Sequence, residues 1–142
     1  MLRRRRSRRP REATRSVTPE PAREPVVTSA ALEGTLQARL GVLERELSAT
    51  TGDVSLCAIS RSAGSVPAVK HLEGRLAALM ELRRAGREDG PHPGTLETLL
   101  ATWRRGLEEV RAREAGPDWV AYRAGGVDEL EELAHRLTDP PG

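Results

Sequence analysis

The sequence is poor in several residue types, and each shortage narrows the class of protein it can encode. Its 142 residues include no phenylalanine or asparagine, one lysine, one isoleucine and three aromatic side chains. A core built from this chain must therefore consist mainly of leucine and alanine. Cys57 is the only cysteine, so no disulfide can form within the chain. The scarce residues have AT-rich codons, so the preference for arginine over lysine reflects a GC-rich gene.

Long apolar runs are also missing. No stretch approaches the roughly 18 apolar residues of a transmembrane helix. The run Arg3–Arg6 resembles the start of a twin-arginine export signal, but the polar sequence Pro-Arg-Glu-Ala-Thr-Arg follows in place of an apolar segment. We therefore expect a cytoplasmic protein that neither spans a membrane nor is exported.

Charge is divided unevenly along the chain. Residues 1–25 hold nine arginines and three glutamates, a net charge of +6, whereas residues 26–142 have a net charge of −4. The basic part also contains four prolines and almost no apolar side chains, so burial cannot offset the entropy lost on ordering. We predict a disordered arginine-rich arm over residues 1–27, a helical domain over 28–138 and a short tail over 139–142.

Apolar residues repeat with the period of an α-helix in four parts of the predicted domain. Such stripes are typical of helices that bury one face against one another. The sequence therefore predicts an all-α fold, a small bundle of about four amphipathic helices. The expected helices cover residues 29–49, 67–85, 96–115 and 118–137.

Capping residues predict two helix starts, and a glycine pair marks one interruption. Thr28 or Ser29 can cap the first helix, and Thr95 is a natural cap for the third. Gly125-Gly126 interrupts the fourth, which is either one helix with a weak spot or two short helices. Residues 50–66 alternate in polarity over a few positions, but a lone strand has no pairing partner, so a partly buried loop is expected.

The first helix carries a stripe made only of leucine. This stripe must be covered by the other helices of the domain or by a second molecule, and an intermolecular coiled-coil seam is an alternative. We predict that it is an association face. Its members are Leu32, Leu36, Leu40, Leu43 and Leu47.

The arginine-rich arm predicts contact with nucleic acid. Guanidinium groups that neutralise phosphates release condensed counterions, which drives binding at low salt. No aromatic side chain is interleaved to stack on bases, so recognition of sequence is not expected. A solubilising tail, or a start codon assigned too early, is the alternative. The predicted phosphate contacts are Arg3, Arg4, Arg5, Arg6, Arg8, Arg9, Arg11 and Arg15.

No constellation indicates catalysis or metal binding. Glu132 and His135 have the i, i+3 spacing of carboxylate di-iron bundles, but the second such pair is missing. Cys57 lacks a recognisable nucleophile motif, and a small buried thiol is expected there. We therefore predict no catalytic residue, no metal site and no cofactor. An acidic cluster is interpreted as a solvated face at the start of the last helix, and it comprises Asp128, Glu129, Glu131 and Glu132.

Two further features have alternative interpretations. Residues 62–67 form a loop that can bind an anion before a helix N-terminus or can simply connect two helices. Trp103, Trp119 and Tyr122 are expected to be the bulkiest members of the core, and a partly exposed aromatic patch is the alternative.

These features together favour a non-enzymatic accessory or adaptor protein. Its helical body would bind a protein partner or itself, and its arm would contact nucleic acid without sequence preference. A purely protein-binding module with an incidental basic tail is the alternative hypothesis. A ligand-binding or enzymatic helical bundle is the third, and no constellation in the sequence supports it.

Overall fold

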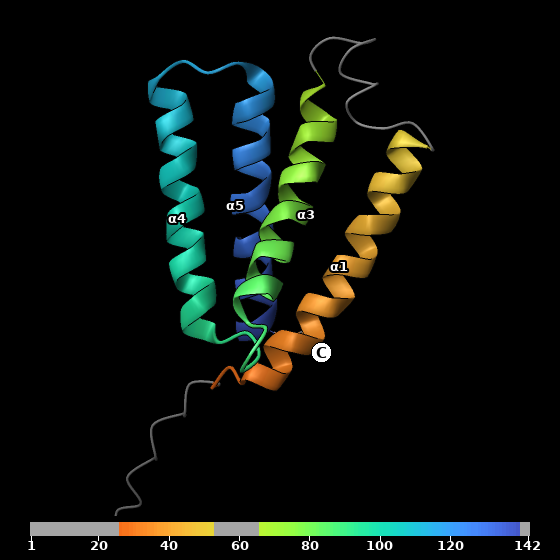
Figure 1. Cartoon of the computed structure of the whole chain (residues 1–142), viewed down its shortest axis with the longest axis vertical. Coiled ribbons are helices and arrows are strands. Elements are labelled where there is room, and N and C mark those ends of the chain that lie inside the picture. The colour runs from red at the N-terminus through yellow and green to blue at the C-terminus, as the bar shows by residue number, and fades with distance from the viewer. Residues whose placement is uncertain (1–25, 53–65, 140–142) are drawn as a thin grey trace, which may run out of the picture.

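The computed structural model of the chain describes residues 26–52 and 66–139, in which it contains four helices and no strand. Successive helices run in opposite directions, so α3 and α5 are parallel to each other (Figure 1). The predicted all-α bundle is thereby confirmed. The predicted arm, the segment around Cys57 and the tail fall largely outside the described ranges. The helices are α1 (Ser29–Thr51), α3 (Pro67–Ala85), α4 (Pro93–Ala112) and α5 (Pro117–Thr138).

The starts of the helices follow local signals in the sequence. The Thr28 hydroxyl caps α1 by accepting a hydrogen bond of 3.1 Å from the backbone N–H of Ala31. Proline stands in the first turn of α3, α4 and α5, where its fixed φ suits a helix and its missing N–H is not needed. The predicted start of α4 after Thr95 is wrong for this reason, because Pro93 already begins the helix.

Helices α3 and α5 form the centre of the bundle and touch backbone to backbone. A Cβ atom on Gly74 would overlap the carbonyl oxygen of Tyr122, and one on Gly125 would overlap the carbonyl oxygen of His71. Gly126 is equally constrained, because a Cβ there would enter the Trp103 ring. Helix α5 is continuous through Gly125-Gly126. The glycine pair is thus the point of closest helix approach, and the alternative of two short helices is wrong.

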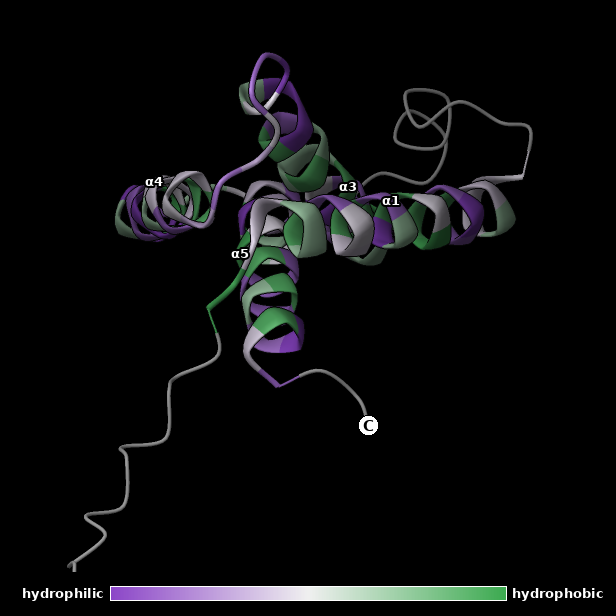
Figure 2. Ribbon diagram, turned by 90° about the horizontal axis from the view of Figure 1, so that it is seen from below, coloured by the Kyte–Doolittle hydropathy of each residue, from purple (hydrophilic) through white to green (hydrophobic). Residues whose placement is uncertain are grey.

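Helices α1 and α4 lie on opposite sides of this central pair (Figure 2). Helix α1 packs against α3 and α5, whereas α4 packs mainly against α5. One connected apolar core results, in which leucine predominates as the composition requires. Its fully or nearly fully buried members from the two outer helices are Leu32, Leu36, Leu40, Leu43, Leu96, Leu99, Trp103, Leu107 and Val110.

Most large apolar side chains of the four helices face the core, and Trp119 of α5 is the exception. Within residues 26–52 and 66–139, none of the helices is apolar over a length that would cross a bilayer.

Candidate functional site

Several predicted site residues lie outside the described ranges. These are Cys57, the loop that precedes Val66, and all eight arginines assigned to phosphates: Arg3, Arg4, Arg5, Arg6, Arg8, Arg9, Arg11 and Arg15. Their roles stay predictions.

The leucine stripe of α1 is largely covered within the chain. Leu32, Leu36, Leu40 and Leu43 are buried against α3 and α5, while Leu47 is partly exposed. A second molecule could reach the four buried leucines only if α1 moved away from the bundle. Association through this face stays a prediction, because the structure describes one chain.

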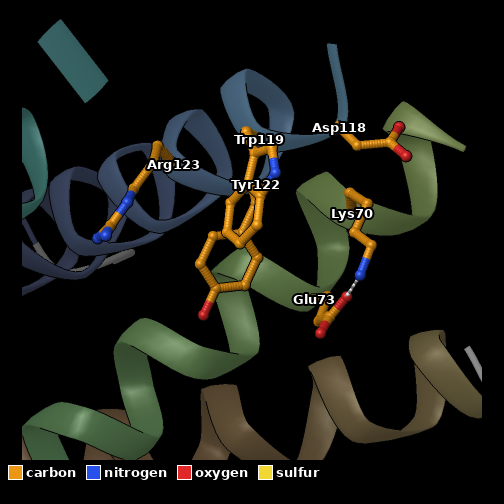
Figure 3. Close-up of a pocket in the computed structure, with 6 residues that line it drawn as sticks. All are labelled: Lys70, Glu73, Asp118, Trp119, Tyr122 and Arg123. Carbon is orange, nitrogen blue, oxygen red and sulfur yellow. Dashed lines mark hydrogen bonds and ion pairs between the residues drawn. The ribbon is translucent and has the colours of Figure 1, made fainter. Parts of the chain in front are cut away.

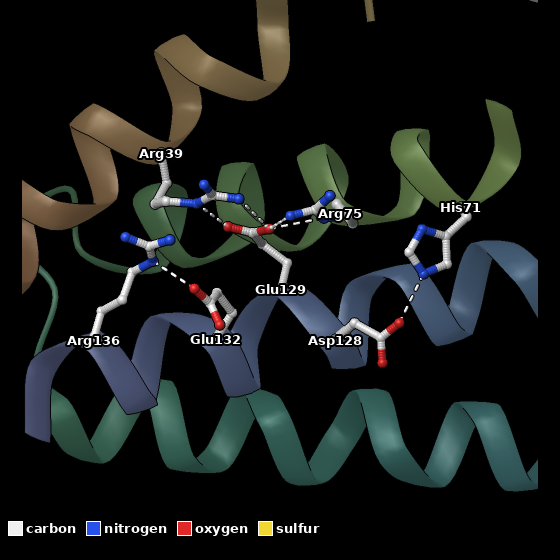
Figure 4. Close-up of polar contacts among 7 residues, drawn as sticks. All are labelled: Arg39, His71, Arg75, Asp128, Glu129, Glu132 and Arg136. Atoms are coloured by element: carbon white, nitrogen blue, oxygen red, sulfur yellow. Dashed lines mark hydrogen bonds and ion pairs between the residues drawn. The ribbon is translucent and has the colours of Figure 1, made fainter. Parts of the chain in front are cut away.

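Three helices meet at the carboxylate of Glu129, in α5, whose side chain is 0% exposed (Figure 4). Arg39 of α1 donates from Nε to Oε1 at 2.7 Å and from Nη2 to Oε2 at 2.9 Å. Arg75 of α3 donates from Nε to Oε2 at 2.9 Å, and its Nη2 lies 2.7 Å from the same oxygen. We call these three residues the Glu129 triad. The interpretation of the acidic cluster as a solvated face is wrong for Glu129.

The acidic cluster lies in the middle of α5 and not at the predicted helix start. Glu129 lies twelve residues after Pro117, the first residue of α5. The dipole at the N-terminus of the helix therefore does not act on its carboxylate. Its charge is balanced instead by two guanidinium groups. The hydrogen bond from Arg39 to Glu129 raises the pKa of that guanidinium above its ordinary value, and burial of the side chain partly opposes this.

The neighbours of the triad form exposed or half-exposed ion pairs. Arg136 Nε lies 2.7 Å from Glu132 Oε1, and His71 Nε2 lies 2.7 Å from Asp128 Oδ2. Glu132 is therefore paired with an arginine one turn away on the same helix. In the part of the chain that the structure describes, no three or more His, Cys, Asp or Glu side chains are grouped so that they could hold a metal ion.

The second candidate site is a hollow of about 490 Å³ at the end of the bundle where α3 and α5 begin (Figure 3). The Val66 backbone N–H donates to Asp118 Oδ1 at 2.9 Å and fixes the two helix starts to each other. We call this feature the Trp119 surface. Its lining residues are Lys70, Glu73, Asp118, Trp119, Tyr122 and Arg123.

The three aromatic residues of the chain form a ladder from the core to this surface. Trp103 is 3% exposed and Trp119 is 59% exposed, with the Tyr122 ring between them. The centroid distances are 5.5 Å from Trp103 to Tyr122 and 6.4 Å from Tyr122 to Trp119, the latter pair meeting edge to face. Trp103 is thus a core residue as predicted, whereas the prediction fails for Trp119 and the alternative of an exposed patch holds.

Charged groups of both signs surround the aromatic rings. Lys70 Nζ lies 2.7 Å from Glu73 Oε2, and the two side chains face each other on α3. Arg123 points away from them, with its Cζ atom 5.1 Å from the centroid of the Trp103 ring. Burial raises the pKa of the Tyr122 hydroxyl, and the nearby Glu73 carboxylate raises it further.

Neither arrangement could be assembled from the sequence. The triad joins residues separated by 90 and 54 positions along the chain, and no local pattern pairs them. For the triad, the sequence offers one signal: Arg39 lies at the edge of the leucine stripe of α1. A charged side chain beside an apolar helix face needs a partner of opposite charge. For the Trp119 surface, the helical periodicity places Trp119 on the apolar face of its helix and so predicts that it is buried.

Comparisons of the chain with protein-family models, with curated proteins and with solved structures find no match.

Proposed function

We propose that the chain is a non-enzymatic adaptor whose helical body binds a protein partner or a second copy, and whose basic arm contacts nucleic acid. The observation that carries this proposal is the division of charge: residues 1–25 have a net charge of +6, while the remainder has −4. This division supports separate polyanion-binding and protein-binding parts. The proposed setting is the cytoplasm, where nucleic acid and protein partners are both accessible.

The arm is proposed to bind phosphates and not bases. Arginine presents several donors to a phosphate oxygen, and each neutralised phosphate releases counterions. Residues 1–25 contain no aromatic side chain for stacking, so affinity should not depend on sequence. The arginines proposed to act here are Arg3, Arg4, Arg5, Arg6, Arg8, Arg9, Arg11 and Arg15.

The body is proposed to provide the protein contact. Trp119 is the largest exposed apolar side chain of the described residues, and tryptophan is enriched at binding hot spots. The same observation favours a second candidate function, a protein-binding module in which the arm is incidental. Both candidates use the body in the same way and differ only in the arm.

A salt titration of duplex binding separates the two candidates. If the arm neutralises about five phosphates, log K should fall against log salt with a slope of about −4.5, and two unrelated duplexes should give the same slope. Replacing the first six arginines by alanine should flatten the slope. Those residues are Arg3, Arg4, Arg5, Arg6, Arg8 and Arg9.

A matched control removes the same charge from the body. Six exposed arginines are available for this purpose, so the control has an equal net charge and an intact arm. It should keep the steep slope. Equal loss in both variants would assign binding to overall charge, and absence of binding at low salt would favour the purely protein-binding module. The six control positions are Arg83, Arg84, Arg87, Arg105, Arg111 and Arg113.

A further inference from the structure

The Trp119 surface has the chemistry of a site that takes a proline-rich segment. Trp119 and Tyr122 present two aromatic rings edge to face at 6.4 Å, and Trp119 is 59% exposed. Grooves lined by aromatic rings bind extended proline-rich chains, because the polyproline II conformation is preformed and loses little entropy on binding. The Tyr122 ring lies against the buried Trp103 ring, so the inner wall of the surface is continuous with the core.

The chain itself contains such a segment. Residues 18–25 read Thr-Pro-Glu-Pro-Ala-Arg-Glu-Pro, with prolines at positions 19, 21 and 25. The segment carries two glutamates and one arginine between its prolines. The hollow carries both signs as well, with Lys70 and Arg123 as cations and Glu73 and Asp118 as anions. Lys70 is paired with Glu73, and Asp118 accepts a hydrogen bond from the Val66 N–H, so the aromatic rings and not the rim charges carry the proposed recognition.

We propose that the Trp119 surface binds the proline-rich segment 18–25 of a second copy of this chain. This deepens the self-association part of the proposed function by naming the partner and the contact, and it rests on that part alone. The contact of the arm with nucleic acid is independent of it.

The geometry excludes binding of this segment to the surface of its own copy. Helix α1 begins beside the start of α4, where Ser29 Oγ lies 3.0 Å from His92 Nδ1. Helices α3 and α5, whose N-terminal parts line the Trp119 surface, begin at the opposite end of the bundle (Figure 1). Helix α4 has 20 residues and connects these ends, so they are about 30 Å apart at a rise of 1.5 Å per residue.

The chain before α1 is too short to cover this distance with the proline-rich segment. Pro19 stands seven residues before Val26. Even a fully extended chain of that length spans only about 25 Å. Pro25 is bonded to Val26 and cannot leave that end of the bundle. Glu73 and Arg123 line the near edge of the hollow six residues into α3 and α5, about 9 Å closer than the helix starts, so Pro19 alone can reach this edge in its own copy. Pro21 stands five residues before Val26 and spans at most about 18 Å, so the whole segment can lie along the surface of a neighbouring copy and not along its own.

The resulting contact joins two unlike surfaces. A heterologous contact of this kind closes when two copies exchange their segments and extends into a row when they do not. Either assembly places several arginine-rich arms on one particle. Linked arms bind a polyanion more tightly than single ones by effective concentration, so self-association would strengthen nucleic-acid binding.

The direct test titrates a synthetic peptide of residues 17–26 into the full chain and follows tryptophan fluorescence. Trp103 is buried, so a blue shift on binding reports Trp119. We expect saturable binding, and at least tenfold weaker binding for a peptide with Pro19→Ala and Pro21→Ala. The Trp119→Ala chain should show no shift. No shift with the native peptide up to about 1 mM, the weak limit of specific binding, would overturn the proposal.

A mixing experiment tests the arrangement of the two copies. Trp119→Ala removes the receiving surface and Pro19→Ala with Pro21→Ala removes the inserted segment, so each variant alone should sediment as a monomer. Their mixture should form a heterodimer, because one intact contact remains. His135→Ala is the matched control, being exposed on the same helix at the other end of the bundle, and should associate like the native chain. Circular dichroism checks that every variant keeps its helicity.

The remaining outcomes also decide the question. Association that persists in both variants would place the contact elsewhere, for example on the leucine stripe of α1, and would overturn the proposal. Binding of a peptide of residues 3–15 in place of residues 17–26 would assign the surface to arginine side chains and would overturn it too. In each case the nucleic-acid function is tested separately, by the slope of log K against log salt for the variant that lacks the first six arginines.

Discussion

Replacing Glu129 by glutamine should destabilise the protein far more than the same change three residues later. The Glu129 carboxylate is fully buried and accepts hydrogen bonds from two guanidinium groups. A glutamine keeps the shape but leaves two cations without a counterion. Breaking a buried ion pair from one side costs about 3–5 kcal/mol.

The lower end of that range applies here. Arg39 and Arg75 are 13% and 25% exposed, so both keep part of their hydration when the carboxylate is lost. We therefore expect Glu129→Gln to lower the free energy of unfolding by about 3 kcal/mol. For a body of about 100 residues this corresponds to a fall of about 12–24 °C in the melting temperature.

Glu132→Gln is the matched control. It is the same chemical change on the same helix, but the Glu132 and Arg136 side chains are 40% and 41% exposed. An exposed pair one turn apart contributes about 0–1 kcal/mol. Urea and thermal unfolding followed by circular dichroism measure both variants. Equal stability of Glu129→Gln and Glu132→Gln would refute the reasoning, since it would show that the triad is no more than a surface pair.

Three further predictions concern packing and ionisation. Gly125→Ala should lower the free energy of unfolding by about 1–3 kcal/mol in urea titrations, because the added Cβ would overlap the His71 carbonyl. Gly34→Ala is the control: the position has open space around it, so the same change should raise the free energy of unfolding by about 1 kcal/mol. Leu40→Asp should undock α1 and lower both helicity and melting temperature, since an unpaired carboxylate cannot remain at a position that is 2% exposed. Unchanged helicity and melting would contradict this. Tyr122 is the only tyrosine, so absorbance at alkaline pH should show its midpoint above 10.0. Because folding raises this pKa, its contribution to stability is complete below pH 10 and is lost as the pH rises through the folded value.

The fold could be predicted because its determinants are local. The leucine stripe of α1 has the helical period, and Pro67 marks a helix start that the structure reproduces. The predicted α4 boundary is wrong because Thr95 is a possible side-chain cap, whereas Pro93 is a first-turn residue and begins the helix. Both residues favour a helix start, and the fixed φ of Pro93 determines where α4 begins.

The sites could not be predicted because periodicity fixes an angle around the helix but not a position along the bundle. Trp119 has nearly the same phase as Leu130, eleven residues later, yet Leu130 is buried and Trp119 is exposed in the first turn. Glu129 shows the converse. Helix α5 contacts α1, α3 and α4, so its buried arc is wider than a stripe and includes a charged residue. That width depends on how many neighbours a helix has, which no local pattern records.

The parallel contact between α3 and α5 has a consequence for the order in which the chain assembles. Two adjacent helices in a hairpin can meet as soon as their loop closes, but parallel helices cannot be joined by a short turn. Here the chain must travel the length of α4 before Gly74 meets Tyr122 and His71 meets Gly125. The central contact therefore joins residues far apart in the sequence. The conformational entropy of closing this long loop is lost in the folding step that brings α3, α4 and α5 together. Helix α1, which adds to one side of that unit, can dock last and undock first, and amide hydrogen exchange should be fastest in α1.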